Sequence, residues 1–365
     1  MNKSFIKIAT VSTVFAFGVG FLSNQFKTVE PLLAEQHADN YVAYTYSGNY
    51  YSSLTGSLTD GLQGTLRKSL SSLILPQGWY TYSGSQANQL GKVLQSADED
   101  PTNSANMVLF YSRDSVIKQA SSNDSWNREH VWPQSLSNGH WGKEKAGADL
   151  LHIRPTWVAT NSKRGNTLYG DVSKANPQVY NGMTYAYTSG NYFEPIDAVK
   201  GDVARILMYV WTAYIDYYND SSLFITKAIA NYDTLLKWHT MDKPDVLEGH
   251  RNDFSESSIQ KNRNPFVDHP EMAWKIFGDS ASAEVKEACK AAYPDVNNQG
   301  GQTSSSQETI SSSSSAEVIS STQTNASSQE QQKKRGCNGS LLMIPIASAS
   351  AIFGLTIIFS KRKKK

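Results

Sequence analysis

The amino-acid composition changes abruptly near residue 296, and this change limits which part of the chain can fold. From 296 to 336 the residues are mostly Ser, Thr, Gln and Asn, with almost no large apolar side chains. Such a segment cannot bury enough apolar surface to offset the entropy lost on ordering. We therefore expect a disordered stalk at 296–336 and one folded domain at 40–295.

The beginning of the chain predicts export. Residues 1–34 have the features of a signal peptide, because Lys3 and Lys7 accompany an apolar run at 8–22. The residues at 32–34 do not define a cleavage site. An uncleaved N-terminal anchor is therefore the alternative.

The end of the chain predicts a transmembrane anchor with a basic cytoplasmic tail at 337–365. Residues 340–359 are apolar and uncharged, and about 20 residues suffice to cross a bilayer. Five basic residues follow at 361–365, and such charges stay in the cytoplasm. The layout resembles the surface-anchoring tails of Gram-positive bacteria, but Cys337 stands where a sortase motif is expected. We expect an exported protein held in the plasma membrane at the cell surface, with release as the alternative and Cys337 as a processing or lipidation point or a plain juxtamembrane residue.

The charge distribution argues against a protein that coats nucleic acid. The whole chain has a net charge of +1, but between residues 28 and 300 there are 30 acidic and 23 basic residues. Proteins that bind nucleic acid over a broad surface are usually basic. The cysteines, Cys289 and Cys337, are too few to predict a disulfide framework.

The folded part shows helical periodicity most clearly between Asp202 and Tyr218, where apolar residues recur every three or four positions. The remaining elements that we expect are helices at 56–75, 86–95, 222–239 and 269–277 and a strand at 107–112. This pattern predicts one mixed α+β domain that is rich in helix, with helices more numerous than strands.

Residues 126–170 carry the candidate chemistry. The runs are Trp126 to Pro133 (WNREHVWP), Asp149 to Pro155 (DLLHIRP) and Asn161 to Asn166 (NSKRGN). This segment contains six basic and three acidic residues, whereas the domain around it is acidic. A local positive charge of this kind favours a phosphodiester substrate.

The residue types suit metal-assisted hydrolysis. His130 is the kind of side chain that takes a proton near neutral pH. Glu129 and Asn161 offer hard oxygen atoms, which suit Mg²⁺. Arg128 and Arg164 can hold phosphate as planar forks, although for Arg128 a surface charge is an equal alternative.

The local pattern predicts a strand–strand–helix unit. Residues 126–132 predict a strand that ends at Pro133, and residues 150–153 predict its partner. Pro155 favours a helix start and Gly165 a helix end. This unit would bring His130 and Asn161 together around one metal ion.

These three runs resemble the endonuclease I family, whose members carry a ββα-metal (His-Me) finger. The resemblance extends over about residues 45–278. It implies a metal-dependent endonuclease that cleaves DNA, RNA or both. It implies His130 as the general base, Glu129 and Asn161 as ligands of one Mg²⁺ (other divalent cations being alternatives), and Arg164 as a phosphate contact.

One departure from the family affects His152. Many relatives have two adjacent histidines at this point, whereas Leu151 precedes a single His152 here. We expect a structural or supporting role for His152, and likewise for Asp268 and His269. We infer no protein partner.

Three functions remain open from the sequence. The first is a sugar-nonspecific, Mg²⁺-dependent endonuclease at the cell surface. The second is a nuclease restricted to RNA or to DNA. The third is a catalytically inactive surface protein that binds nucleic acid or acts as an adhesin, which the stalk and the acidic domain allow.

Overall fold

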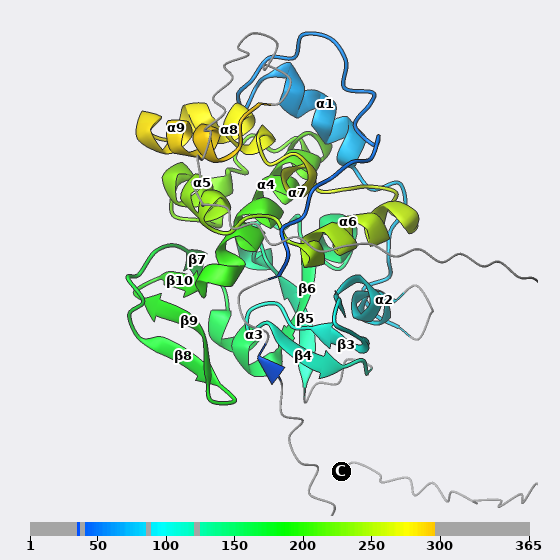
Figure 1. The fold of residues 1–365 in the computed structure, drawn as a ribbon, viewed down its shortest axis with the longest axis vertical. Coiled ribbons are helices and arrows are strands. Elements are labelled where there is room, and N and C mark those ends of the chain that lie inside the picture. Colours follow the sequence, from blue (N-terminus) through cyan, green and yellow to red (C-terminus); the bar gives the residue numbers. More distant parts are fainter. Residues whose placement is uncertain (1–34, 37–40, 85–88, 120–124, 296–365) are drawn as a thin grey trace, which may run out of the picture. The chain divides into compact units, whose positions relative to one another are not determined.

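The computed structural model describes residues 35–36, 41–84, 89–119 and 125–295 (Figure 1). The predicted signal peptide, stalk and membrane anchor lie outside the described residues and remain predictions. In the described part of the chain, no helix is both long enough and apolar enough to cross a bilayer.

In the described part of the chain, most residues of regular secondary structure lie in helices. They are α1 (Thr65–Ile74), α2 (Leu90–Ala97), α3 (Val158–Arg164), α4 (Asp197–Tyr218), α5 (Tyr232–Met241), α6 (Val246–Ser257), α7 (Pro265–Asp268), α8 (Met272–Phe277) and α9 (Ala283–Ala292). The predicted mixed, helix-rich α+β fold is confirmed. The expectation that helices outnumber strands is also confirmed for the described residues, where nine α-helices and four short 3-10 helices compare with ten strands.

Within the described residues, three small sheets accompany the helices. The first has the strand order β1-β4-β3-β2, the second β7-β10-β9-β8, and the third is the pair β5-β6. The strands are β1 (Glu35–Gln36), β2 (Glu99–Asp100), β3 (Asn103–Val108), β4 (Asp114–Ile117), β5 (Trp126–His130), β6 (Ile153–Trp157), β7 (Leu168–Tyr169), β8 (Pro177–Tyr180), β9 (Met183–Ser189) and β10 (Tyr192–Pro195).

Helix α4 is the centre of the larger hydrophobic core. Its residues from Val199 to Tyr214 are buried, and it packs against α1, α5 and α7 (Figure 1). A side chain at Gly201 would place its Cβ 1.9 Å from the Asp242 carbonyl oxygen, so this close approach requires glycine. The helix ends at Asn219, which adopts the left-handed conformation of a C-cap.

Several element boundaries differ from the sequence-based expectations. The predicted helix at 56–75 begins only at Thr65, because Gly56 and Gly61 adopt positive φ angles of 82° and 90°. The predicted helix at 222–239 is divided by Asn231, which caps α5 by accepting a hydrogen bond from the backbone NH of Thr234. The predicted strand at 107–112 lies instead at Asn103–Val108.

A second, smaller hydrophobic core lies behind the β5-β6 pair. It joins Leu90 and Leu94 of α2 to Trp126 and Ile153 of the two strands. This core fixes the two strands against α2 and thereby sets the position of the candidate site.

Candidate active site

The predicted strand–strand–helix unit is present. β5 and β6 pair antiparallel, with Glu129 opposite Arg154 and His130 opposite Ile153, and α3 follows β6 directly. We call β5, β6 and α3 the finger. Gly165 ends α3 at a φ of 54°, as predicted. The partner strand and the helix both begin about three residues later than expected, because Arg154 to Thr156 pair with β5 and remain extended.

Glu129 faces helix α3. Successive side chains of a strand point to opposite faces, so Asn127 and Glu129 share one face of β5. On this face Asn161 donates from Nδ2 to Asn127 Oδ1 (2.7 Å) and Arg164 Nε lies 3.3 Å from Glu129 Oε1. The Glu129 side chain is almost fully buried, and burial raises its pKa to about 7, although Arg164 and Tyr111 oppose this shift.

Two tyrosines that the sequence analysis did not single out hold the Glu129 carboxylate. The Tyr111 hydroxyl donates to Glu129 Oε1 at 2.6 Å and lies 2.6 Å from the Tyr169 hydroxyl. Both tyrosines are fully buried. Nothing in their sequence spacing connects them to Glu129, since they come from the β3–β4 turn and from β7.

Arg164 is also fully buried on this face. Its guanidinium donates to the carbonyl oxygens of Val131 and Gly165, both at 2.9 Å, and lies over the Tyr169 ring. This placement does not support the predicted phosphate contact, because the guanidinium is closed off from solvent and engaged by the protein. Arg164 instead neutralises Glu129 and ties α3 to the end of β5.

Asn161 presents an oxygen that has no partner among the described residues. Its Nδ2 donates to Asn127 Oδ1 and to the Arg128 carbonyl oxygen (3.3 Å), which fixes the orientation of the amide. Its Oδ1 therefore points away from β5. Asn161 is half-buried, so this oxygen is accessible to a ligand.

His130 lies on the opposite face of β5. Its Nε2 is 3.2 Å from the Gly147 carbonyl oxygen and 3.0 Å from Gln134 Nε2, and its ring stacks on Tyr82. Burial, with a smaller contribution from nearby Arg128, lowers the pKa of His130 to about 4. The imidazole is therefore neutral at pH 7 and able to accept a proton.

Arg128 shares the face of His130, two residues earlier on β5. Its Cζ lies 4.3 Å from the centre of the Tyr82 ring. The structure thus brings Glu129, Asn161 and Arg164 together on one side of β5, and Arg128 and His130 together on the other. The sequence analysis predicted that His130 and Asn161 come together around one metal ion, whereas they lie on opposite sides of β5.

His152 has a structural role, as expected. It is fully buried, its Nε2 accepts from the Trp132 backbone NH, and its Nδ1 lies 2.7 Å from the Ala146 carbonyl oxygen. Burial lowers its pKa to about 3. Asp268 is likewise structural, since Tyr51 and Arg263 bond its two carboxylate oxygens.

The face shared by Glu129 and Asn161 fits a hard divalent cation. Glu129 Oε2 and Asn161 Oδ1 are oxygen atoms without a hydrogen-bond donor among the described residues, and a buried carboxylate gains from a neighbouring positive charge. Among the described residues, no three His, Cys, Asp or Glu side chains form a larger cluster. Mg²⁺ keeps several waters and is commonly held by few protein ligands.

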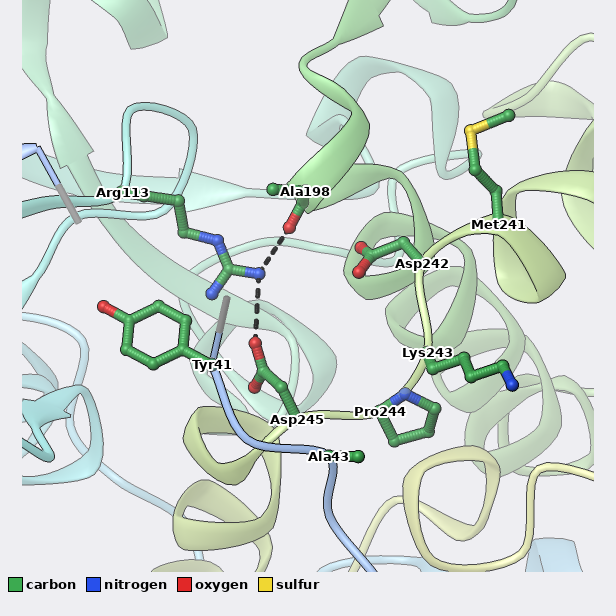
Figure 2. Close-up of a pocket in the computed structure, with 9 residues that line it drawn as sticks. All are labelled: Tyr41, Ala43, Arg113, Ala198, Met241, Asp242, Lys243, Pro244 and Asp245. Carbon is green, nitrogen blue, oxygen red and sulfur yellow. Dashed lines mark hydrogen bonds and ion pairs between the residues drawn. The ribbon is translucent and has the colours of Figure 1, made fainter. Parts of the chain in front are cut away.

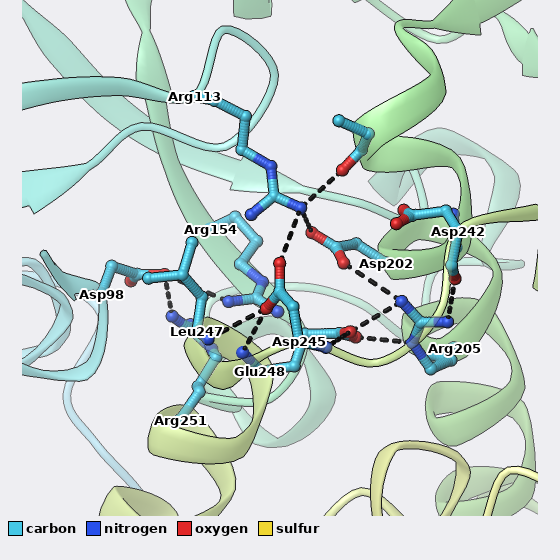
Figure 3. A network of polar contacts seen from close by, with 12 residues as sticks. Asp98, Arg113, Arg154, Asp202, Arg205, Asp242, Asp245, Leu247, Glu248 and Arg251 are labelled. Atoms are coloured by element: carbon cyan, nitrogen blue, oxygen red, sulfur yellow. Dashed lines mark hydrogen bonds and ion pairs between the residues drawn. The ribbon is translucent and has the colours of Figure 1, made fainter. Parts of the chain in front are cut away.

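A separate pocket lies away from the finger. It has a volume of about 270 Å³, and the side chains of Arg113, Asp242 and Asp245 contribute to its lining (Figure 2). These charged groups belong to a buried network in which Arg113 and Arg205 bind the carboxylates around α4 and α6 (Figure 3). No finger residue lines this pocket.

Comparison with known proteins identifies the family of the chain. A sequence model of the family described as Endonuclease I matches residues 62–271, which is more than half of the chain and includes the whole finger. The chain belongs to the endonuclease I family. It is therefore a nuclease by family, and the ββα arrangement of its finger is in keeping with this membership.

Two bacterial proteins are similar to the chain over most of their length. In an alignment of 249 residues the chain is 36% identical to an extracellular ribonuclease of Bacillus subtilis (strain 168), and the match covers 64% of this chain and 80% of that protein. In an alignment of 243 residues it is 34% identical to an extracellular ribonuclease of Bacillus amyloliquefaciens, and the match covers 62% of this chain and 78% of that protein.

Proposed function

We propose that this protein is an exported, Mg²⁺-dependent endonuclease with little sequence specificity, tethered to the outer face of the plasma membrane by residues 337–365. The observation that carries the proposal is a pair of oxygens, Glu129 Oε2 and Asn161 Oδ1, that have no hydrogen-bond donor among the described residues and lie on a finger whose first strand ends in a neutral histidine. Export is supported by the names of both relatives, which are extracellular.

His130 would act as the general base. Its buried, neutral imidazole takes a proton from the attacking water, and contacts with Gly147 and Gln134 hold the ring in place. Glu129 and His130 are the last two residues of β5, so a phosphodiester lying across the end of the strand would meet both faces. Arg128 would hold that phosphate.

Glu129 and Asn161 would hold the metal ion. A bound Mg²⁺ supplies a positive charge that stabilises the phosphate as charge develops on it. Tyr111 and Arg164 hold the Glu129 carboxylate in position for this role.

RNA is the substrate that the relatives favour, since both are named ribonucleases. The sequence analysis left DNA equally open. We therefore propose RNA as the first substrate to test, with DNA beside it. Activity on both polymers at similar rates would identify a sugar-nonspecific nuclease.

The full-length protein should be incubated with ribosomal RNA and with plasmid DNA, in Mg²⁺ and in EDTA. The matched pair of variants is His130→Ala and His250→Ala, since His250 lies on α6 and bonds the Ser96 carbonyl oxygen. We expect cleavage that requires Mg²⁺, falls about 100- to 10,000-fold in His130→Ala and persists in His250→Ala. Binding of nucleic acid without cleavage in any divalent metal would refute the enzyme and favour the binding protein.

Tethering has its own test. The full chain should sediment with membranes, whereas a chain ending at residue 336 should be released into the medium. Equal release of both proteins would refute the anchor and leave the nuclease proposal intact.

A further inference from the structure

Two aromatic residues of one segment each hold a cation beside His130. Trp79 and Tyr82 lie in the segment between α1 and α2. Lys145 Nζ lies 4.7 Å from the centre of the Trp79 ring, and Arg128 Cζ lies 4.3 Å from the centre of the Tyr82 ring. We call these two pairs the cation strip.

The backbone fixes the two rings in place. Gln77 donates its NH to the Gln260 carbonyl oxygen, and a Cβ at Gly78 would lie 2.6 Å from the Ile259 carbonyl oxygen. At the other end, Gln89 caps α2 and donates from Nε2 to the Tyr82 carbonyl oxygen. The rings are therefore held before any ligand arrives, which lowers the entropy lost on binding.

One pair of the strip contacts His130 directly, and the other is linked to it through the chain at Gly147. Arg128 stands two residues before His130 on the same face of β5, and the His130 ring stacks on Tyr82. Lys145 stands two residues before Gly147, whose carbonyl oxygen meets His130 Nε2. One cation thus comes from the strand that carries His130 and the other from the loop that covers it.

The two cations lack acidic partners, which sets them apart from similar groups. The described arginines other than Arg128 each lie within ion-pair distance of a carboxylate; they are Arg67, Arg113, Arg154, Arg164, Arg205, Arg251 and Arg263. Within the described residues, no ion pair or hydrogen bond involves the side chain of Arg128 or of Lys145, and both residues are only half-buried. Arg128 Nε is moreover shielded from solvent without a partner.

We infer that the cation strip is a substrate subsite that binds the phosphates of a nucleic-acid strand on either side of the bond next to His130. A half-buried cation that rests on an aromatic ring and has no counter-ion is suited to an anionic ligand. Because each ring already contacts a cation, the strip recognises the phosphates of the strand and not its bases. This inference rests on the proposed function and adds to it the residues Trp79, Tyr82 and Lys145.

The test is binding without cleavage. The full-length protein in EDTA is titrated into a fluorescent single-stranded 2′-O-methyl oligonucleotide at several salt concentrations, and fluorescence anisotropy is measured. Arg128→Gln and Lys145→Gln should each lower the slope of log affinity against log salt by roughly 0.7, the effect of one lost phosphate contact on a single strand. The matched control, Lys174→Gln, removes an exposed lysine paired with Asp197 and should leave the slope unchanged.

The rings are tested by size-matched changes. Tyr82→Leu should weaken binding about two- to five-fold, and Tyr82→Phe should restore it, since the ring and not the hydroxyl holds Arg128. In cleavage assays Lys145→Gln should raise KM with kcat nearly unchanged. Parental affinity and slope in both cation variants would overturn the inference. If the parent binds with the expected slope changes but cleaves nothing, the subsite stands and the hydrolase fails.

Discussion

The finger and the ion network around α4 and α6 both bury several charged side chains, but they use them differently. In the network, Arg205 binds both oxygens of Glu248 at 2.7 and 2.6 Å, and Arg113 binds Asp202 and Asp245 (Figure 3). In the finger, Glu129 and Asn161 each keep one oxygen without a donor among the described residues.

This difference distinguishes polar groups that stabilise the fold from polar groups that can bind a ligand or take part in a reaction. A buried charge whose hydrogen-bonding positions are filled by the protein holds elements together and has nothing left for a ligand. A buried carboxylate with an unfilled position is costly to keep unless a ligand completes it. We therefore expect changes in the network to alter stability and changes in the finger to alter activity.

The largest effect on stability should follow Arg205→Met. This change leaves Glu248 and Asp202 without their shared guanidinium and should lower the free energy of unfolding by about 3–5 kcal/mol. Urea denaturation measures this loss, and the cleavage rate per folded molecule should be unchanged. Lys174→Met, at an exposed ion pair, should cost less than about 1 kcal/mol. A large loss of activity in folded Arg205→Met would contradict the expectation that the network controls stability and the finger controls activity.

Arg164→Lys tests whether Arg164, a residue of the finger, contributes to stability in the way that the network residues do. Lysine keeps the charge near Glu129 but loses the fork that bonds Val131 and Gly165, so unfolding should become easier by about 1.5–3 kcal/mol. The salt dependence of oligonucleotide binding should stay at the parental value, because Arg164 is buried. A reduced salt slope with unchanged stability would restore Arg164 as a phosphate contact.

A smaller effect should appear in the pH dependence of stability. His239 is fully buried, and burial lowers its pKa to about 3, below the ordinary value of 6.5. Between these pH values the unfolded chain binds the proton and the folded chain does not, so stability falls as pH decreases from 6.5. One such group contributes a slope of up to about 1.4 kcal/mol per pH unit. His239→Gln should flatten the curve of unfolding free energy between pH 6.5 and 4 by about this slope, and an unaltered curve would contradict it.

The sequence predicted the elements that depend on local pattern. Helix α4 was predicted from its recurring apolar residues, although the structure buries Val199 to Tyr214 on all sides and not along one face only. Gly165 signalled the end of α3 because only glycine adopts its backbone conformation readily. The start of α3 was predicted too early because Pro155 favours a helix start in isolation. Here Pro155 pairs with Arg128 inside the sheet, and this tertiary contact overrides the local preference.

The candidate site was predicted as a set of residues but not as an arrangement. Glu129 and His130 are adjacent in sequence, and the strand that contains them necessarily places them on opposite faces. The sequence analysis placed His130 with Asn161 around one metal ion. It assigned Arg164 to phosphate from its planar fork and from the family resemblance, whereas packing of α3 on β5 buries Arg164 beside Glu129.

What the sequence by itself determined is the chemistry that is available: a histidine, a carboxylate, an amide and several arginines in three ordered runs that identify the family. Only the tertiary structure decided which of these groups are neutralised and which stay open. Trp79, Tyr82 and Tyr111 come from segments that precede the finger, and Tyr169 comes from β7 just after it; no motif in the sequence assigns them to the site. Their role arises because folding brings these side chains to the two faces of one strand, where burial and ring contacts control each charge.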